Sequence, residues 1–138
     1  FAGKMSNDVA WQVIRNNSAF IRRQRGIQKA FSREPLNLKG INSPNYNGLT
    51  NAKAVGVTLA EDNKSVVVTV KKSGKKNLPA KSLIKTTIKR GGARGIIKSV
   101  QGLVKGRNAR FAKLAARRAS QLLRSVQRSA KTAKKSSA

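Results

Sequence analysis

The sequence contains no cysteine and no histidine, and its only carboxylates are those of Asp8, Glu34, Glu61 and Asp62. Without cysteine there is no disulfide, zinc ribbon or thiol nucleophile, and without histidine there is no imidazole base or HExxH zinc motif. Glu61 and Asp62 are adjacent in a segment typical of a turn, so they lack the spacing of an acid/base pair. The composition therefore predicts a protein with no catalytic site, no metal site and no cofactor.

Long apolar runs and aromatic residues are also scarce. No stretch of 18 apolar residues occurs in the 138-residue chain, so the sequence predicts no membrane span. No apolar signal-peptide core lies near the first residue, and we therefore expect a cytosolic or nuclear location. Aromatic residues make up 4% and apolar residues 38% of the chain, which allows one modest core.

Positive charge dominates the sequence and is concentrated in its second half. The chain has 31 lysine and arginine residues and a formal net charge of +27. Residues 1–70 carry a net charge of +6, whereas residues 71–138 carry 21 basic residues and no acidic residue. Because the second half cannot form internal salt bridges, its counterions must come from outside. A solvated basic surface is the alternative, but a nucleic-acid partner accounts better for so many like charges.

The first predicted element is a helix over residues 8–16. Ser6 or Asn7 is expected as its N-cap, because short polar side chains accept hydrogen bonds from the first free backbone N–H groups. Apolar residues spaced three and four apart form a stripe with Trp11 at its edge. Trp11 could stack on a base, but its place beside the stripe favours a position in the core.

The rest of the first half predicts strands and a long loop. Residues 19–23 are expected to form a short strand. Residues 32–50 are rich in proline, asparagine and glycine, so we expect an irregular segment that packs through its apolar side chains. Valines alternate over residues 55–59 and 66–70 on either side of a polar turn, which predicts a β-hairpin.

The second half predicts helices. Residues 81–90 fit either a helix or an alternating strand, and we favour the helix. Residues 93–105 and 109–127 each place apolar side chains on one face and basic side chains on the other, with a break between them at residues 106–108. This pattern predicts an antiparallel pair of amphipathic helices. The Ser-, Ala- and Lys-rich tail from residue 129 is expected to be disordered when unbound.

The predicted fold class is therefore α+β. We expect a small antiparallel β-sheet domain with an N-terminal helix, followed by basic amphipathic α-helices and a disordered basic tail. The expected boundaries are residues 1–76 for the mixed α+β domain with its hairpin, residues 77–128 for the basic helical region and residues 129–138 for the tail.

Several classes of partner can use a basic amphipathic helix, including an anionic membrane surface and calmodulin. Helices of that kind usually carry Trp or Phe on the apolar face. Here the predicted helix over residues 109–127 has only Phe111, and the one over residues 93–105 has no aromatic residue. No helix-turn-helix, zinc finger, KH loop or RNP aromatic pair is visible. Because aromatic residues are few, base stacking is not favoured, and the pattern indicates recognition of the backbone and shape of a folded RNA.

The candidate RNA-binding side chains come from the short strand, the basic segment after the hairpin and the polar faces of the two amphipathic helices. Each of them can donate to a phosphate oxygen. They are Arg22, Arg23, Arg25, Lys71, Lys72, Lys75, Lys76, Arg94, Lys98, Arg107, Arg110, Lys113, Arg117, Arg124 and Arg128.

Several separated blocks occur in collinear order over roughly residues 5–125. They are WQVIRNNSAF at 11–20, EPLNLKGINS at 34–43, YNGL at 46–49, VGV at 55–57, the valine strand at 66–70, TTI at 86–88, ARRAS at 116–120 and LRS at 123–125. Together they resemble the eukaryotic family of the large-subunit ribosomal protein numbered twenty-eight. Because the blocks are several and in order, the resemblance is more specific than any one short motif.

The resemblance implies a structural component of the cytosolic large ribosomal subunit, without catalysis and with nucleolar transit during assembly. The implied partners are large-subunit ribosomal RNA and neighbouring ribosomal proteins, with no membrane and no small-molecule substrate. A nucleolar ribosome-assembly factor with a related N-terminal domain is the runner-up. That factor carries cysteines and a long acidic C-terminal region, and this chain has neither.

Two features depart from the family pattern. Met5 and Ser6 resemble the usual start of the family, so Phe1 to Lys4 form an extension. Pro44 stands where the family carries an aromatic residue, so the resemblance implies no stacking role at this position.

Overall fold

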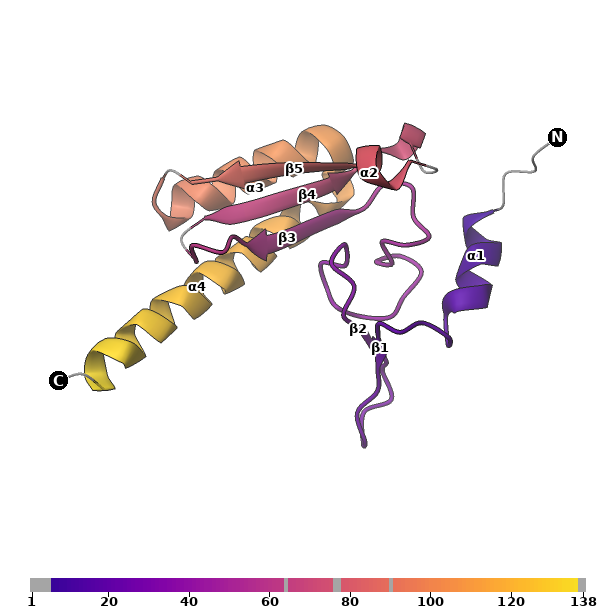
Figure 1. Ribbon diagram of the computed structural model, residues 1–138, viewed down its shortest axis with the longest axis horizontal. Coiled ribbons are helices and arrows are strands. Elements are labelled where there is room, and N and C mark those ends of the chain that lie inside the picture. Colours follow the sequence, from indigo (N-terminus) through magenta and orange to yellow (C-terminus); the bar gives the residue numbers. More distant parts are fainter. Residues whose placement is uncertain (1–5, 64, 76–77, 90, 137–138) are drawn as a thin grey trace.

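The computed structural model describes residues 6–63, 65–75, 78–89 and 91–136 of this α+β fold (Figure 1). The α+β class is the one that the sequence predicts, and the Phe1–Lys4 extension lies outside the described residues. In chain order the elements are α1 (Asn7–Ile14), β1 (Ile21–Arg22), β2 (Phe31–Ser32), β3 (Val55–Leu59), β4 (Val66–Lys71), the 3-10 helix η1 (Ser73–Lys75), α2 (Pro79–Ser82), β5 (Leu83–Ile88), α3 (Ala93–Asn108), the 3-10 helix η2 (Ala109–Phe111) and α4 (Ala112–Ser136).

The central layer is a three-stranded antiparallel sheet in the order β3-β4-β5. β3 and β4 form the predicted hairpin, in a register that pairs Val55 with Val70 and Leu59 with Val66. Val66, Val68 and Val70 of β4 are buried. The residues between them are less buried, because successive side chains of a strand point to opposite faces of the sheet. The predicted short strand near residue 21 is confirmed as β1, which pairs with β2 in a separate two-stranded ribbon.

The third strand corrects the sequence-based interpretation. Residues 81–90 were expected to be helical, but the helix α2 ends at Ser82 and residues 83–88 form β5. β5 pairs with β4, which places Ile84 opposite Val70 and Ile88 opposite Val66. The alternating isoleucines and threonines suit a pleated surface, and the free edge of β4 supplies the backbone partners that a helix would not use. Tertiary pairing therefore decides a segment whose local sequence fits both structures.

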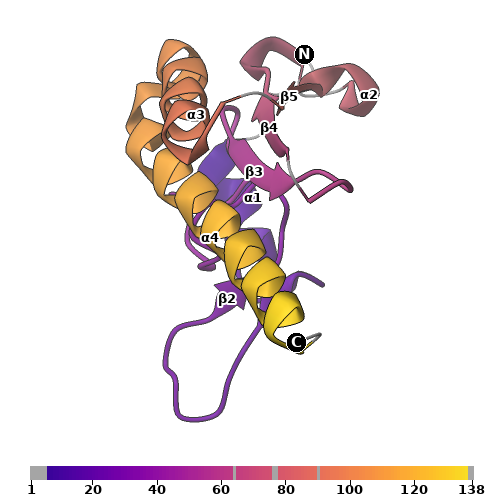
Figure 2. The same ribbon diagram turned by 90° about the vertical axis from the view of Figure 1, so that its left-hand side faces the viewer.

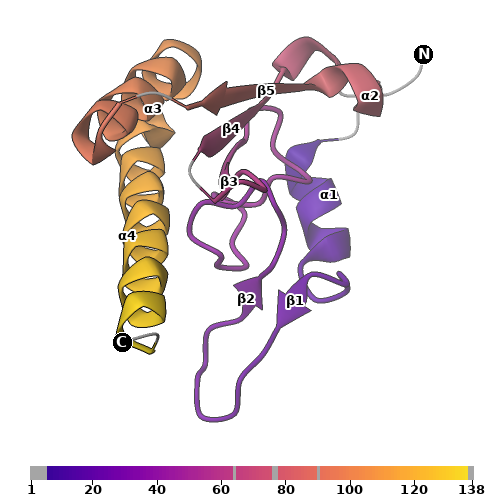
Figure 3. The same ribbon diagram turned by 60° about the vertical axis from the view of Figure 1, so that its left-hand side comes forward.

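The core lies between the sheet and the helices α3 and α4. Ile96, Val100 and Val104 of α3 are buried against the valines of β3 and β4. Ala115 and Ala119 of α4 have no exposed surface, so small side chains allow this helix to approach the sheet closely. The two helices run in opposite directions in Figures 1 and 3 and pack on each other, as predicted for an antiparallel pair.

The junction between these helices differs from the expected one. The sequence predicted a break at residues 106–108, but α3 continues to Asn108 and the chain turns in η2. A glycine inside a helix costs only about 1 kcal/mol relative to alanine. The free energy gained by burying Val104 and Phe111 on either side of the turn is larger than this cost, so Gly106 does not end the helix.

The basic tail also differs from the expectation. Residues 129–138 were expected to be disordered when unbound, whereas α4 continues to Ser136 and residues 137–138 lie outside the described part of the chain. Extending an existing helix requires no new nucleus, and Ala and Lys are good helix formers. Figure 1 shows the last turns of α4 projecting beyond the sheet.

Residues 32–50 form the predicted irregular segment, and polar side chains hold it together. Asn37 donates to a carboxylate oxygen of Glu34 and to the carbonyl oxygen of Ile41, both at 2.9 Å. The side-chain oxygen of the buried Asn47 accepts from the backbone N–H of Thr50 at 3.0 Å. No buried side-chain nitrogen or oxygen in the described residues lacks a hydrogen-bond partner. The segment is thus a fixed part of the fold.

Two glycines allow close packing, Gly48 within this segment and Gly56 between the segment and the sheet. A Cβ atom at Gly48 would overlap the Cβ atom of Leu36, and one at Gly56 of β3 would overlap the carbonyl oxygen of Pro35. The backbone of the segment at Pro35 therefore lies directly against β3 at Gly56. Both positions require the absence of a side chain rather than an unusual backbone angle.

Helix α1 begins as expected at Ser6, whose hydroxyl accepts from the backbone N–H of Asp8 at 3.3 Å. The helix ends at Ile14, two residues before the predicted end. Its last turn is tied to the irregular segment, because the side chain of Asn42 donates to the carbonyl oxygen of Arg15 at 2.7 Å.

The apolar stripe of α1 does not reach the core. Val9 and Val13 are 53% and 67% exposed, and Trp11 is half-buried outside the core cluster. The expectation that Trp11 lies in the core is therefore wrong. Figure 3 shows the reason, since α1 lies to the side of the irregular segment and away from the sheet. Among the described residues, no helix has the length and apolar character that crossing a bilayer requires.

We expect Gly56→Ala to lower the free energy of unfolding by about 1–3 kcal/mol, the range for a side chain forced into a packed region. The matched control is Gly102→Ala in α3, where a Cβ atom meets nothing within 4 Å. This control should raise stability by about 0.5–1 kcal/mol, since alanine is the better helix former. Urea unfolding followed by circular dichroism measures both. A Gly56→Ala protein as stable as the wild type would contradict the close packing of the irregular segment on β3.

Candidate nucleic-acid interface

A basic surface follows one side of α4. Lys113, Arg117, Arg124 and Arg128 are exposed, while Ala115 and Ala119 on the other side are buried against the sheet. We call these four cations the α4 stripe. At 1.5 Å per residue the stripe extends for about 22 Å along the helix. Figure 2 shows α4 on the outside of the fold, so the stripe is open to a large partner.

Helix α3 and the turn after it carry further candidate cations. Arg94 and Lys98 are exposed near the beginning of α3, and Arg107 is exposed near its end. The Arg110 guanidinium lies 5.6 Å from the ring centre of Phe111, within the range of a cation–π interaction. The opposite face of α3 is buried in the core, which fixes the direction in which these side chains leave the helix.

The basic segment after the hairpin divides into side chains with different surroundings. Lys71 is half-buried, and its ammonium donates to the carbonyl oxygens of Gly48 at 2.9 Å and Leu49 at 3.2 Å. Lys72 and Lys75 are exposed, whereas Lys76 lies outside the described residues. Lys71 therefore already has a structural role, because it joins the end of β4 to the irregular segment.

The cations of the first half lie around the β1-β2 ribbon. Arg22, Arg23 and Arg25 are all exposed, and the Arg23 guanidinium donates to the side-chain oxygen of Asn16 at 3.3 Å. Arg23 and Trp11 line the same open cavity of about 550 Å³ between α1 and the ribbon. These arginines are at a distance along the chain from the helices but are equally accessible.

The outer face of the sheet carries two lysines that the sequence analysis did not select. β5 turns Lys85 and Thr87 to the side opposite the core, where they line an open surface with Lys89, Thr58 and Thr69. Reading residues 81–90 as a helix hid this row. Alternation at every second residue was the signal that could have found it.

Two of the four acidic side chains, Glu34 and Asp62, are held by hydrogen bonds within the fold. Glu34 is buried, and its carboxylate accepts from the Asn37 side chain at 2.9 Å and the Gly48 backbone N–H at 3.2 Å. Asp62 lies in the turn of the hairpin and accepts from the Ser65 hydroxyl at 2.9 Å. The sequence places no carboxylate in α3 or α4. All the charged side chains of these two helices are therefore cationic.

The candidate surfaces on α3, α4 and the β1-β2 ribbon offer many hydrogen-bond donors and positive charges. Within the described ranges, no group of three or more potential metal-ligating side chains comes together. Tyr46 and Phe111 pack on each other with ring centres 6.2 Å apart, so these two rings are occupied within the fold. Pro44 is exposed, and its carbonyl oxygen accepts from the Asn51 side chain at 2.7 Å.

Fold and surface together define a small, strongly basic α+β protein. The chain matches the model of the Ribosomal L28e protein family over residues 9–125. The large ribosomal subunit protein eL28 of Caenorhabditis elegans is 46% identical over 131 residues, which cover 94% of this chain and 98% of that relative. The chain belongs to the ribosomal L28e protein family, which confirms the resemblance seen in its sequence blocks.

Two further relatives carry the same name. The large ribosomal subunit protein eL28 of Schizosaccharomyces pombe is 38% identical over 133 residues, covering 93% of this chain and 97% of the relative. The protein of that name from Dictyostelium discoideum is 39% identical over 83 residues, covering 60% of each chain. The first two comparisons extend over nearly the whole chain, so the similarity includes the sheet and both long helices.

The different surroundings of Lys71 and Lys72 give a test. We expect Lys71→Gln to lower the free energy of unfolding by about 1–2 kcal/mol, because it removes charge-assisted hydrogen bonds to two backbone carbonyls. The adjacent control Lys72→Gln changes an exposed side chain and should stay within about 0.5 kcal/mol of the wild type. Thermal and urea unfolding give both values. Equal effects of the two substitutions would refute the structural role of Lys71.

Proposed function

We propose that this protein is a structural constituent of the large ribosomal subunit and binds folded ribosomal RNA through phosphate contacts. The observation that carries the proposal is the α4 stripe. It lies on the side of α4 opposite the buried apolar face, in the half of the chain that has no acidic residue. The names of the relatives, large ribosomal subunit proteins, support the same assignment. The role is structural rather than catalytic.

The physical basis of binding is charge neutralisation. Each lysine or arginine that meets a phosphate releases counterions condensed on the RNA, so affinity rises as salt falls. The sheet and its core hold α3 and α4 in place before binding, and fewer conformations are lost when RNA docks. The proposed contacts are the exposed cations of the α4 stripe, of α3, of the segment after β4 and of the β1-β2 ribbon.

The small number of exposed aromatic rings in the described part of the chain fits recognition of the RNA backbone and shape. Tyr46 and Phe111 are packed against each other, and the other rings in the described part of the chain are the half-buried Trp11 and Phe31 and the 39% exposed Phe20. Stacking of successive bases needs a row of exposed rings. We therefore propose that phosphates and sugars, rather than bases, are the principal contacts.

The proposed location is the cytosolic ribosome, with transit through the nucleolus during assembly. Neighbouring ribosomal proteins are proposed as further partners, because the exposed Val9 and Val13 can pack against apolar side chains of another protein and make no hydrogen bond to RNA. A membrane and a small-molecule substrate are not proposed as partners. An assembly factor bound only to precursor particles remains the second candidate.

Sedimentation of a tagged full-length protein from a eukaryotic lysate separates these assignments. We expect it to migrate with large subunits and polysomes, and to be released from them by high salt because phosphate contacts dominate. Exclusive migration with nucleolar precursor particles would overturn the ribosomal assignment in favour of the assembly factor. Migration with membranes would favour binding to an anionic lipid surface.

Neutralising two members of the α4 stripe tests the proposed contact face. With at least about six phosphate contacts, the plot of log K against log salt for a large-subunit RNA fragment should have a slope of about −4 or steeper. Arg117→Gln combined with Arg124→Gln should reduce the steepness by about 1.5–2, because two phosphate contacts are lost. Fluorescence anisotropy at several salt concentrations measures the slopes.

The adjacent Arg118 provides the control, because it lies about 100° around the helix from Arg117 and is also exposed. Arg118→Gln alone should change the slope less than Arg117→Gln alone. A wild-type slope shallower than about −3 would refute the electrostatic mechanism. An unchanged slope in the double variant would show that the α4 stripe does not contact RNA.

A further inference from the structure

A basic cavity of about 360 Å³ lies where three segments of the chain meet at one end of the sheet. Lys53 enters it from the segment before β3, Lys72 and Gly74 from the end of β4 and η1, and Arg107 from the last turn of α3. In Figure 1, β4 and α3 both end on the side of the sheet where η1 and α2 lie. Residues more than fifty positions apart in sequence are thus brought to one place.

The walls of this basic cavity are fixed by backbone and side-chain hydrogen bonds. The backbone N–H of Lys71 donates to the carbonyl oxygen of Ala54 at 2.9 Å, and that of Lys72 donates to the carbonyl oxygen of Ser82 at 2.8 Å. Lys71 also lines the cavity, and its ammonium is held by the carbonyl oxygens of Gly48 and Leu49. The Lys71 side chain and the backbone at Lys72 are therefore held in place by the fold.

Charge distinguishes this cavity from the open surface on the sheet. The residues lining the basic cavity include four cations and no carboxylate. By contrast, the surface beside β5 combines Lys85 and Lys89 with Glu61 and Asp62. Like charges gathered in a concave site repel one another and raise the local concentration of anions. The basic cavity therefore has the electrostatics of an anion site.

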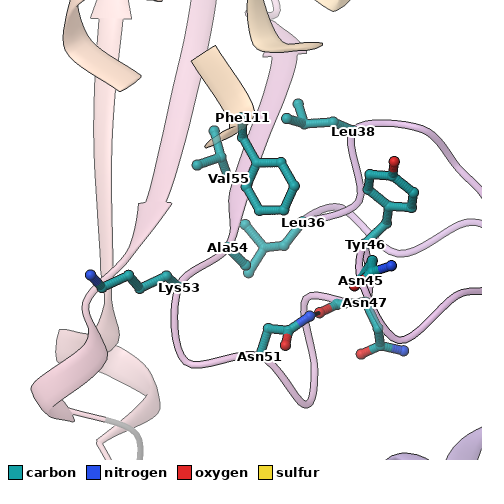
Figure 4. Close-up of a pocket in the computed structure, with 10 residues that line it drawn as sticks. All are labelled: Leu36, Leu38, Asn45, Tyr46, Asn47, Asn51, Lys53, Ala54, Val55 and Phe111. Carbon is teal, nitrogen blue, oxygen red and sulfur yellow. Dashed lines mark hydrogen bonds between the residues drawn. The ribbon is translucent and has the colours of Figure 1, made fainter. Parts of the chain in front are cut away.

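The available side chains also have suitable chemistry. Arg107 presents a planar guanidinium that can bind two phosphate oxygens, whereas Lys53 and Lys72 act as flexible point charges. Figure 4 shows the Lys53 side chain directed away from the apolar cluster of Tyr46 and Phe111. A Cβ atom at Gly74 would meet nothing within 4 Å, so a phosphate can approach this backbone closely.

We propose that the basic cavity binds a single phosphate group of the RNA backbone, with Lys53, Lys72 and Arg107 sharing that one phosphate. This inference rests on the proposed binding of ribosomal RNA and adds a defined subsite to it. It also adds Lys53, which the sequence analysis did not select because its partners become neighbours only in the folded chain. The subsite would fix one point of the RNA relative to the sheet, independently of the α4 stripe.

The slope of the salt dependence counts phosphates rather than cations, and this distinguishes a shared site from separate contacts. We would measure binding of the full chain to a large-subunit ribosomal RNA fragment after Lys53→Gln, Lys72→Gln and Arg107→Gln, singly and together. The triple variant should reduce the steepness of the log–log plot by only about 0.7–0.9, the value for one phosphate. The single variants should be non-additive, because each weakens the same contact.

The matched control is the triple variant Lys113→Gln, Arg117→Gln and Arg124→Gln on the α4 stripe. It removes the same charge from separate contacts and should reduce the steepness by about 2–2.7. An unchanged slope in the cavity variant, or a loss as large as that of the control, would overturn the shared subsite. A wild-type slope shallower than about −3 would instead overturn the proposed function. All three cavity side chains are exposed, so unfolding curves should match the wild type, and the single variants decide the question if the triple variant is unstable.

Discussion

The contact between α4 and the sheet is the interaction on which the rest of the structure depends. A chain with a net charge of +27 repels itself, and the repulsion is greatest in the half that contains both long helices. Apolar burial opposes this repulsion. Ala112, Ala115 and Ala119 have small side chains and almost no exposed surface, so the helix axis lies close to β3. This close packing turns one side of α4 outward and gives its cations a defined direction.

Phe111 joins this contact to the irregular segment before the sheet. Its ring is buried beside Val55 (Figure 4), and its centre is 6.2 Å from that of Tyr46. The Arg110 guanidinium lies 5.6 Å from the same ring centre. The loop, the sheet and the basic helix therefore meet at one side chain. The polar scaffold around Asn37 and Asn47 keeps the loop in the shape that presents Tyr46 to this junction. The irregular segment thus helps to hold the helix that carries the α4 stripe.

Elements decided by local pattern could be predicted from the sequence, and those decided by tertiary contact could not. The β3-β4 hairpin follows from alternating valines, and the faces of α3 and α4 follow from the helical period. β5 was missed because its six residues satisfy both patterns, and only the free edge of β4 favours the strand. Trp11 was misplaced for a similar reason, since its stripe shows amphipathicity but not whether a second layer is within reach.

The basic surface was predictable in kind but only partly in its members. Composition and the helical wheel identify the exposed cations of α4, because both depend on residues near one another in sequence. The gathering of Lys53 with Lys72 and Arg107 depends instead on the turn after β4 and on how far α3 extends past Gly106. The difference has a functional consequence in the proposed complex. A long flexible array of cations supplies affinity in many registers, whereas contacts fixed at both ends of a folded unit also determine its orientation on the RNA. The core that holds the sheet against α3 and α4 is what makes the second kind of binding physically possible.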